Sequence, residues 1–182
     1  MNLEIENLFN DLLSVEDANQ GDAVLFLSLL LERHVPTFRN DPSHLAILPT
    51  SLAQLNFTES EKDEFVTKLC GIVRAREIVE PARRASIACA LAKCGRLEGL
   101  AAALEIFAVL SDSLNEESLY SMLACITPSI CCSNDPRIRE LLLEYQTELA
   151  LEKVEEKYRE QMVEQFLRLR ECIVKIKNSA DK

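Results

Sequence analysis

The chain has 182 residues, of which 48% are hydrophobic and 27% are charged, and its formal net charge is −10 at pH 7. This apolar fraction excludes an intrinsically disordered chain, and the length allows one domain with a sizeable core. The acidic balance argues against nucleic acid or anionic lipid as a general ligand, because most of the surface would repel phosphates. With four glycines, six prolines and no tryptophan, the core must rely on Leu, Ile, Val and Ala, which favours helices.

The first third of the chain carries two helical patterns and one interrupted segment. Residues 5–13 place apolar side chains at helical spacing. A second helix is predicted to open with Asp22 as its N-cap. Across residues 42–56, Pro49 interrupts the pattern, so we expect two short helices or an irregular segment there. Residues 1–56 are therefore assigned to an N-terminal helical cap.

The middle of the chain has clear signals for helix starts and stops. Residues 58–61 fit a capping box that begins a helix. Pro81 begins the next helix, and Gly95 is placed to end it in a left-handed conformation. Residues 113–116 fit another capping box, and Pro128 is predicted to stop the helix that follows.

The last section, residues 137–177, contains no Gly or Pro, so a single long helix fits the pattern. From residue 151 onwards its apolar side chains recur at nearly coiled-coil spacing, and residues 151–182 are assigned to a C-terminal amphipathic helix. The candidates for a seam with a second chain are Tyr158, Met162, Phe166, Leu169 and Ile173. The alternative is a helix that folds back on the body, with a break near residues 146–151.

The stretch ARRASIACALAKCG, residues 82–95, combines small apolar residues with two arginines at its start and a glycine at its end. Together with the leucine-rich residues 100–110, it resembles a HEAT-like helical repeat, in which two helices meet at a glycine turn. Arg84 matches the arginine position of that family. Arg83 stands where the family usually has an apolar residue. The resemblance is centred on residues 81–112.

The resemblance implies a short α-solenoid or helical bundle of antiparallel helix pairs. Residues 59–150 would form these pairs within a single all-α domain of residues 1–182. It also implies a scaffold that binds another protein along one face. Because some HEAT-like proteins are enzyme subunits, including chromophore lyases of light-harvesting proteins, the resemblance alone does not exclude chemistry.

A basic band interrupts the acidic chain, since residues 68–96 hold seven Lys or Arg and two acidic residues. Its guanidinium groups could dock an acidic or phosphorylated partner segment, because they form bidentate contacts with carboxylates and phosphates. The candidate docking residues are Arg74, Arg76, Arg83, Arg84 and Arg96. The alternative is that they neutralise acidic neighbours in the same chain, such as Glu77, Glu80 and Glu98.

No motif identifies a catalytic centre, a metal site or a cofactor site. The sequence has no Cys-x-x-Cys, no His-Glu-x-x-His, no Gly-x-Ser-x-Gly and no phosphate-binding glycine loop. The vicinal pair Cys131 and Cys132 lies in a predicted loop ahead of a helix N-terminus, where the helix dipole would lower a thiol pKa. A small thiol redox protein is therefore an alternative. Otherwise, the seven cysteines are expected to be small buried hydrophobes.

The N-terminus has no secretory signal, and the longest apolar run, residues 23–31, is too short to cross a bilayer. We therefore expect a soluble cytoplasmic protein without a metal or a cofactor. The expected function is a non-enzymatic adaptor that binds another protein through the basic band. The alternatives are the thiol redox protein and a structural homodimer through the C-terminal helix.

Overall fold

The computed structural model describes residues 3–14, 16–32, 47–75, 80–133, 135–158, 160 and 162–179. Every regular element in these residues is a helix, and no strand occurs among them, which confirms the predicted all-α class. The helices are α1 (Leu3–Leu12), α2 (Asp17–Glu32), α4 (Thr50–Ala53), α5 (Glu59–Arg74), α6 (Pro81–Lys93), α7 (Leu97–Leu110), α8 (Glu116–Cys131), α9 (Arg137–Glu144), α10 (Thr147–Tyr158) and α11 (Val163–Ser179).

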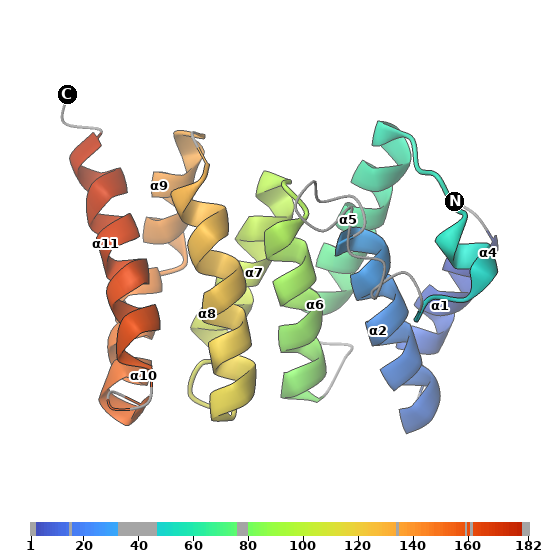
Figure 1. Cartoon of the computed structure of the whole chain (residues 1–182), viewed down its shortest axis with the longest axis horizontal. Helices are drawn as coiled ribbons and strands as arrows, with labels where there is room; N and C mark the ends of the chain where they lie inside the picture. The colour runs from blue at the N-terminus through green and yellow to red at the C-terminus, as the bar shows by residue number, and fades with distance from the viewer. Residues whose placement is uncertain are drawn as a thin grey trace.

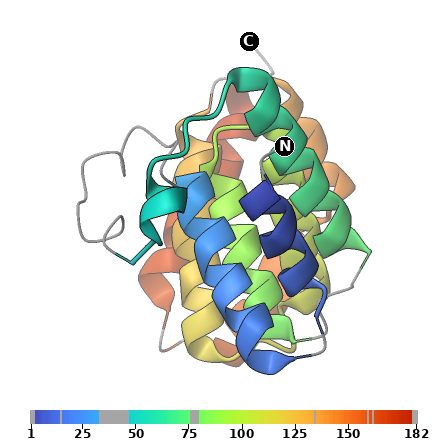
Figure 2. The ribbon, with the colours of Figure 1, turned by 90° about the vertical axis from the view of Figure 1, so that its right-hand side faces the viewer.

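The helices stack in a two-layered row (Figure 1). In one layer, α2, α6, α8 and α11 lie side by side, and each contacts the next. In the other layer, α5 contacts α7, and α7 contacts α9 and α10. Figure 2 looks along the row from the end where α1 lies, and α11 lies at the far end. Each layer buries its inner face against the other, so the core runs along the whole row.

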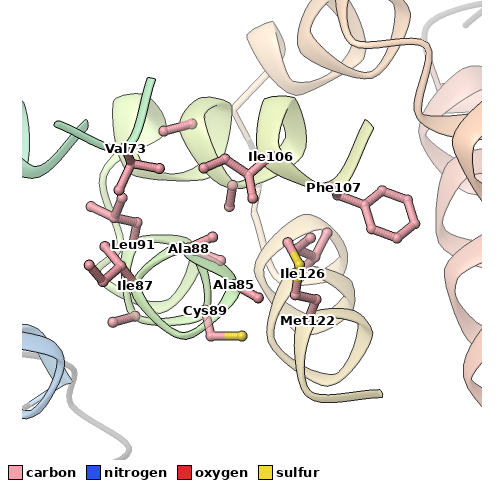
Figure 3. Close-up of a cluster of buried hydrophobic side chains, with 14 of the residues drawn as sticks. Val73, Ala85, Ile87, Ala88, Cys89, Leu91, Ile106, Phe107, Met122 and Ile126 are labelled. Carbon is pink, nitrogen blue, oxygen red and sulfur yellow. The ribbon is translucent and has the colours of Figure 1, made fainter. Parts of the chain in front are cut away.

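The centre of the row is α6, which packs against α2, α5, α7 and α8. Small side chains on α6 allow this close packing, and Figure 3 shows Ala85 and Cys89 beside Met122 of α8. The approach of α7 is closer still at Gly99. A Cβ atom added there would lie 2.5 Å from the carbonyl oxygen of Leu91. The small residues that the sequence concentrates in residues 82–95 therefore serve to bring helices together.

The predicted starts of α5 and α6 and the predicted glycine turn after α6 are confirmed. Thr58 Oγ1 accepts a hydrogen bond from the Glu61 amide at 3.2 Å, and the Glu61 carboxylate accepts one from the Thr58 amide at 2.9 Å. This reciprocal capping box begins α5. Pro81 is the first residue of α6. Gly95, with φ of 75°, makes the turn into α7.

The start of the second helix was predicted wrongly. α2 begins at Asp17, so Asp22 lies inside the helix and does not cap it. The first turn has tertiary partners that the sequence does not reveal. The Gln20 amide donates to a carbonyl of α1 at 3.1 Å and accepts from Arg83 of α6 at 2.8 Å. These contacts favour the helical first turn, although Gly21 costs about 1 kcal/mol inside a helix.

The structure describes only part of the predicted interrupted segment across residues 42–56. Here α4 begins directly after Pro49, which stands at its N-cap. The described part contains one short helix, α4, as expected for an interrupted pattern. Residues 33–46 lie outside the described residues.

Both ends of α8 also differ from the prediction. The N-cap is Asn115, whose side chain accepts from the Ser118 amide at 2.8 Å, so the helix starts later than a cap at Ser113 requires. Pro128 does not stop the helix, which continues to Cys131. Pro128 is exposed in the last turns, where water can satisfy the carbonyl that a proline leaves without a helical donor.

The last section is divided into α9, α10 and α11. The predicted break near residues 146–151 is present at Gln146, which has φ of 47°. A second break separates the end of α10 at Tyr158 from the start of α11 at Val163, so residues 151–182 do not form one helix. This second break allows α11 to turn back and pack on α8.

Candidate functional site

Two arginines of the predicted docking band tie α5 to the α7 region within the chain. Arg74 Nε lies 2.8 Å from the Glu105 carboxylate of α7. Arg96, which precedes α7, bonds to Glu59 and lies 2.9 Å from the Asp63 carboxylate, both on α5. The acidic partners of these arginines are therefore residues of the same layer of helices.

The two arginines on α6 also contact groups of the same chain. Arg83 donates to Gln20 of α2, and its Nε lies 3.2 Å from the Glu80 carboxylate. Arg84 is only 7% exposed, and its guanidinium lies 3.4 Å from the carbonyl oxygen of Val73. The prediction that Arg84 is a surface residue is wrong, because the helix packing turns it into the core.

The four described arginines of the predicted docking band thus contact groups of the same chain. Arg74, Arg83 and Arg96 neutralise carboxylates on different elements, as the intramolecular alternative expected. Arg84 is buried. Arg76 lies outside the described residues.

The interaction of Arg96 with Glu59 predicts a specific acid dependence. Hydrogen bonds from Lys62 and then Arg96 lower the pKa of Glu59 from 4.5 to about 2. Because the folded-state pKa is depressed, this contribution to stability is present above pH 4.5 and is lost as the pH falls from 4.5 towards 2. We expect the Arg96→Gln variant to lose less stability across this window than the wild type.

The measurement is the urea midpoint of unfolding at a series of pH values between about 6 and 2. Arg168→Gln is the matched control, because it removes an exposed Arg–Glu pair within α11. Parallel pH curves for the wild type and Arg96→Gln would contradict the expected coupling.

The predicted dimer seam lies inside the chain. Met162, Phe166, Leu169 and Ile173 are each 2% exposed or less. Tyr158 is half-buried, and its hydroxyl donates to the carbonyl oxygen of Leu114 at 3.2 Å. The last section therefore folds back on the body, which was the alternative, and these side chains are not available to a second chain.

A groove of about 430 Å³ runs between α8 and α11, which lie side by side at one end of the row (Figure 1). Both walls contribute side chains that are largely exposed. The residues at its mouth include Tyr120, Ala124 and Pro128 of α8 and Gln165, Arg168 and Glu171 of α11. Leu123, which is fully buried, also lines the groove. The groove is therefore shallow, and its charged side chains, Arg168 and Glu171, lie on the α11 wall only.

The wall on α8 continues into an exposed face without charge. Residues 118–134 contain no Asp, Glu, Lys or Arg, although 27% of the chain is charged. Tyr120, Ser121, Ala124 and Pro128 are nevertheless exposed on this helix. Solvent-facing helix surfaces are normally charged, whereas interface cores are depleted of charge and enriched in aromatic residues.

A second hollow, of about 330 Å³, lies at the turn between α6 and α7. Its lining includes Arg96, Cys132 and Asp135. Arg96 is held by carboxylates of α5, and Asp135 is bound by Arg137. Arg96 and Asp135 are therefore already paired within the chain, which makes this hollow the weaker candidate.

The cysteines are arranged differently from the prediction. Cys131 forms a disulfide with Cys172 of α11, with Cα atoms 5.4 Å apart, a separation that suits this bond. Cys132 is exposed and is not part of the pair. Cys70 and Cys89 are buried, as expected for small hydrophobic residues. Sequence reasoning missed Cys172, because no local motif links it to a cysteine 41 residues away.

No protein-family model, curated protein or solved structure matches this chain. Its function is therefore inferred from the geometry. Among the described residues, no helix is both long enough and apolar enough to cross a membrane. The same part of the chain contains no group of three or more His, Cys, Asp or Glu suited to a metal ion.

Proposed function

We propose that this protein is a non-enzymatic scaffold that binds a helix of another protein on the face of α8 and in the groove beside it. The observation that carries the proposal is the uncharged, exposed surface of α8 in a chain with 30 acidic and 20 basic residues. Leaving such a surface in water is unfavourable compared with covering it by an apolar partner. Tyr120 offers the kind of aromatic anchor that is frequent at interfaces.

The shape of the groove favours a partner helix over a small ligand. Ligand pockets enclose most of a small molecule, whereas Ala124, Pro128, Arg168 and Glu171 at this groove are exposed. The α8 wall from Tyr120 to Cys131 is roughly 18 Å long, which matches about three turns of a docked helix. Arg168 and Glu171 on the opposite wall carry opposite charges, so the partner needs an apolar face and a mixed polar edge.

This proposal keeps the adaptor function and moves its docking site away from the basic band. An acidic or phosphorylated partner is less well supported, because Arg74, Arg83 and Arg96 already hold carboxylates of the chain. The HEAT-like character of residues 81–112 and a cytoplasmic location remain part of the proposal. The glycine turn at Gly95 and the stacked layers support the former.

The test is Ala124→Arg, which places a long charged side chain in the groove from an exposed helix position. We expect the affinity for the partner to fall at least about tenfold, equal to 1.4 kcal/mol. The matched control is Ala18→Arg, also exposed on a helix but at the other end of the row. Partners are captured from native lysate and compared across wild type and both variants.

The occupant is then identified by a photoreactive phenylalanine derivative placed at position 124. The proposal expects crosslinks to an amphipathic helix of another protein, and no such crosslinks from position 18. Crosslinks only to a second copy of this chain, or equal capture by Ala124→Arg and wild type, would overturn it.

A further inference from the structure

The Cys131–Cys172 disulfide lies in the wall of the α8/α11 groove, and both cysteines line it. It joins the last residue of α8 to the middle of α11. Disulfides buried in a protein core are protected from exchange, whereas exposed ones react with thiols in solution. Because this bond lies in the wall of an open groove, we expect it to react with thiols in solution, and this expectation does not depend on a docked partner.

The two sulfur-bearing residues differ in access. Cys131 is exposed, whereas Cys172 is 9% exposed and packs among the core residues of α11. Thiol–disulfide exchange requires a thiolate to reach one sulfur, and the other sulfur then leaves. An incoming thiolate can reach Cys131 from the groove, so Cys172 becomes the leaving group.

Two other thiols of the chain are poor competitors for this exchange. Burial raises the pKa of Cys70 to about 12, and burial also raises the pKa of Cys94. Both thiols stay protonated near neutral pH, and the protonated thiol is not the nucleophile. Cys132 is exposed beside the disulfide, so it is the thiol that an experiment must control for.

We propose that the Cys131–Cys172 disulfide is a thiol–disulfide exchange site that takes a dithiol as its substrate and is attacked at Cys131. One thiolate of the dithiol bonds to Cys131 Sγ, and the electron pair of the broken bond goes to Cys172 Sγ, which takes up a proton. The second thiolate of the dithiol then attacks the dithiol's own bonded sulfur and releases Cys131 as a thiol. The dithiol is oxidised to a disulfide, and the chain gains two electrons and two protons.

Exchange removes the covalent link between the two walls of the groove. Ile130 and Ile173, next to the disulfide cysteines, remain core residues of α8 and α11. The reduced chain therefore keeps the apolar contact of α11 with α8. The site is thus expected to cycle between a linked and an unlinked groove without unfolding.

The first experiment measures how fast dithiothreitol reduces the disulfide in native Cys132→Ser protein, compared with the same protein in guanidinium chloride. We expect the native rate to lie within about thirtyfold of the denatured rate, because the bond is accessible in the fold. A larger protection, or the absence of a Cys131–Cys172 link in the oxidised protein, would overturn the proposal. A parallel arm with a thioredoxin-type protein dithiol at equal thiol concentration distinguishes a protein-borne substrate from a small one.

The second experiment locates the attacked sulfur. Oxidised Cys132→Ser protein is pulsed with reduced glutathione and quenched with N-ethylmaleimide, and its peptides are mapped by mass spectrometry. The expected product carries glutathione on Cys131 and maleimide on Cys172. Glutathione on Cys172 with maleimide on Cys131 would show attack at the buried sulfur and contradict the proposal. Cys132→Ser is expected to fold like the wild type, because it changes an exposed side chain.

Discussion

Loss of the Cys131–Cys172 disulfide is expected to lower the free energy of unfolding by up to about 4 kcal/mol. The bond closes a loop with a sequence separation of 41 residues, which contains α9 and α10. Closing such a loop restricts the unfolded chain, by about 3 kcal/mol for 15 residues and about 4.7 kcal/mol for 100. A 41-residue separation falls between these values.

The measurement is urea unfolding of oxidised and reduced wild type, with Cys172→Ser and Cys132→Ser as variants. Oxidised Cys132→Ser should match oxidised wild type, because Cys132 is outside the bond. Cys172→Ser should resemble reduced wild type under both conditions. A difference below about 1 kcal/mol in the free energy of unfolding of oxidised and reduced wild type would contradict the prediction. It would show that the bond stabilises the fold much less than loop closure in the unfolded chain implies.

The second large effect is expected at Gly99, where Gly99→Ala should destabilise the protein by about 1–3 kcal/mol. The new Cβ would lie 2.5 Å from the carbonyl oxygen of Leu91 and 2.8 Å from the Cys94 sulfur. The first contact is with backbone, so α6 and α7 must move apart rather than a side chain turning away. This loss exceeds the gain of up to about 1 kcal/mol that alanine normally brings to a helix.

Gly71→Ala is the matched control for Gly99→Ala. Gly71 lies within α5, and a Cβ atom there would meet nothing within 4 Å. We expect this variant to be more stable than wild type by about 0.5–1 kcal/mol, since alanine restricts the unfolded chain and favours the helix. Thermal and urea unfolding of both variants give the comparison. Equal effects at the two glycines would contradict the close approach of α7 to α6.

The docking proposal and the disulfide prediction concern the same end of the row. The groove between α8 and α11, its uncharged wall and its disulfide lie together there. Binding of a helix and exchange of the disulfide are nevertheless separable. Ala124→Arg alters the groove without touching either cysteine, whereas reduction breaks the link without adding charge. Comparing partner binding by oxidised and reduced protein would show whether the two are coupled.

Several features of the fold follow from residues close together in the sequence. The capping box at Thr58, the start of α6 at Pro81 and the turn at Gly95 are all where the pattern places them. Such signals act within one helical turn, so their physical basis is present in a short peptide. The all-α class follows similarly, because apolar residues recur at helical spacing and strand signals are lacking.

Other features were decided by contacts between distant residues. Arg83 and Arg84 are neighbours at the start of the same helix. Packing nevertheless buries Arg84 in the core and leaves Arg83 partly exposed. Cys131 was singled out with its neighbour Cys132, but its partner is Cys172. A disulfide requires two Cα atoms at a suitable distance, and only the return of α11 onto α8 brings them together.

The exposed face of α8 is the clearest example of a feature that the sequence alone does not predict. Residues 85–92 and residues 118–134 both lack charged side chains. Their compositions are too similar to show which run is buried and which faces solvent. By itself, the sequence predicted a helix for residues 85–92 and for the second run as far as Pro128, and it showed that both runs are rich in small or apolar residues. Tertiary structure decided that most of the first run, on α6, is buried by neighbouring helices, whereas the second presents Tyr120, Ala124 and Pro128 to solvent. Burial depends on which helices cover a face, and that depends on packing along the whole row.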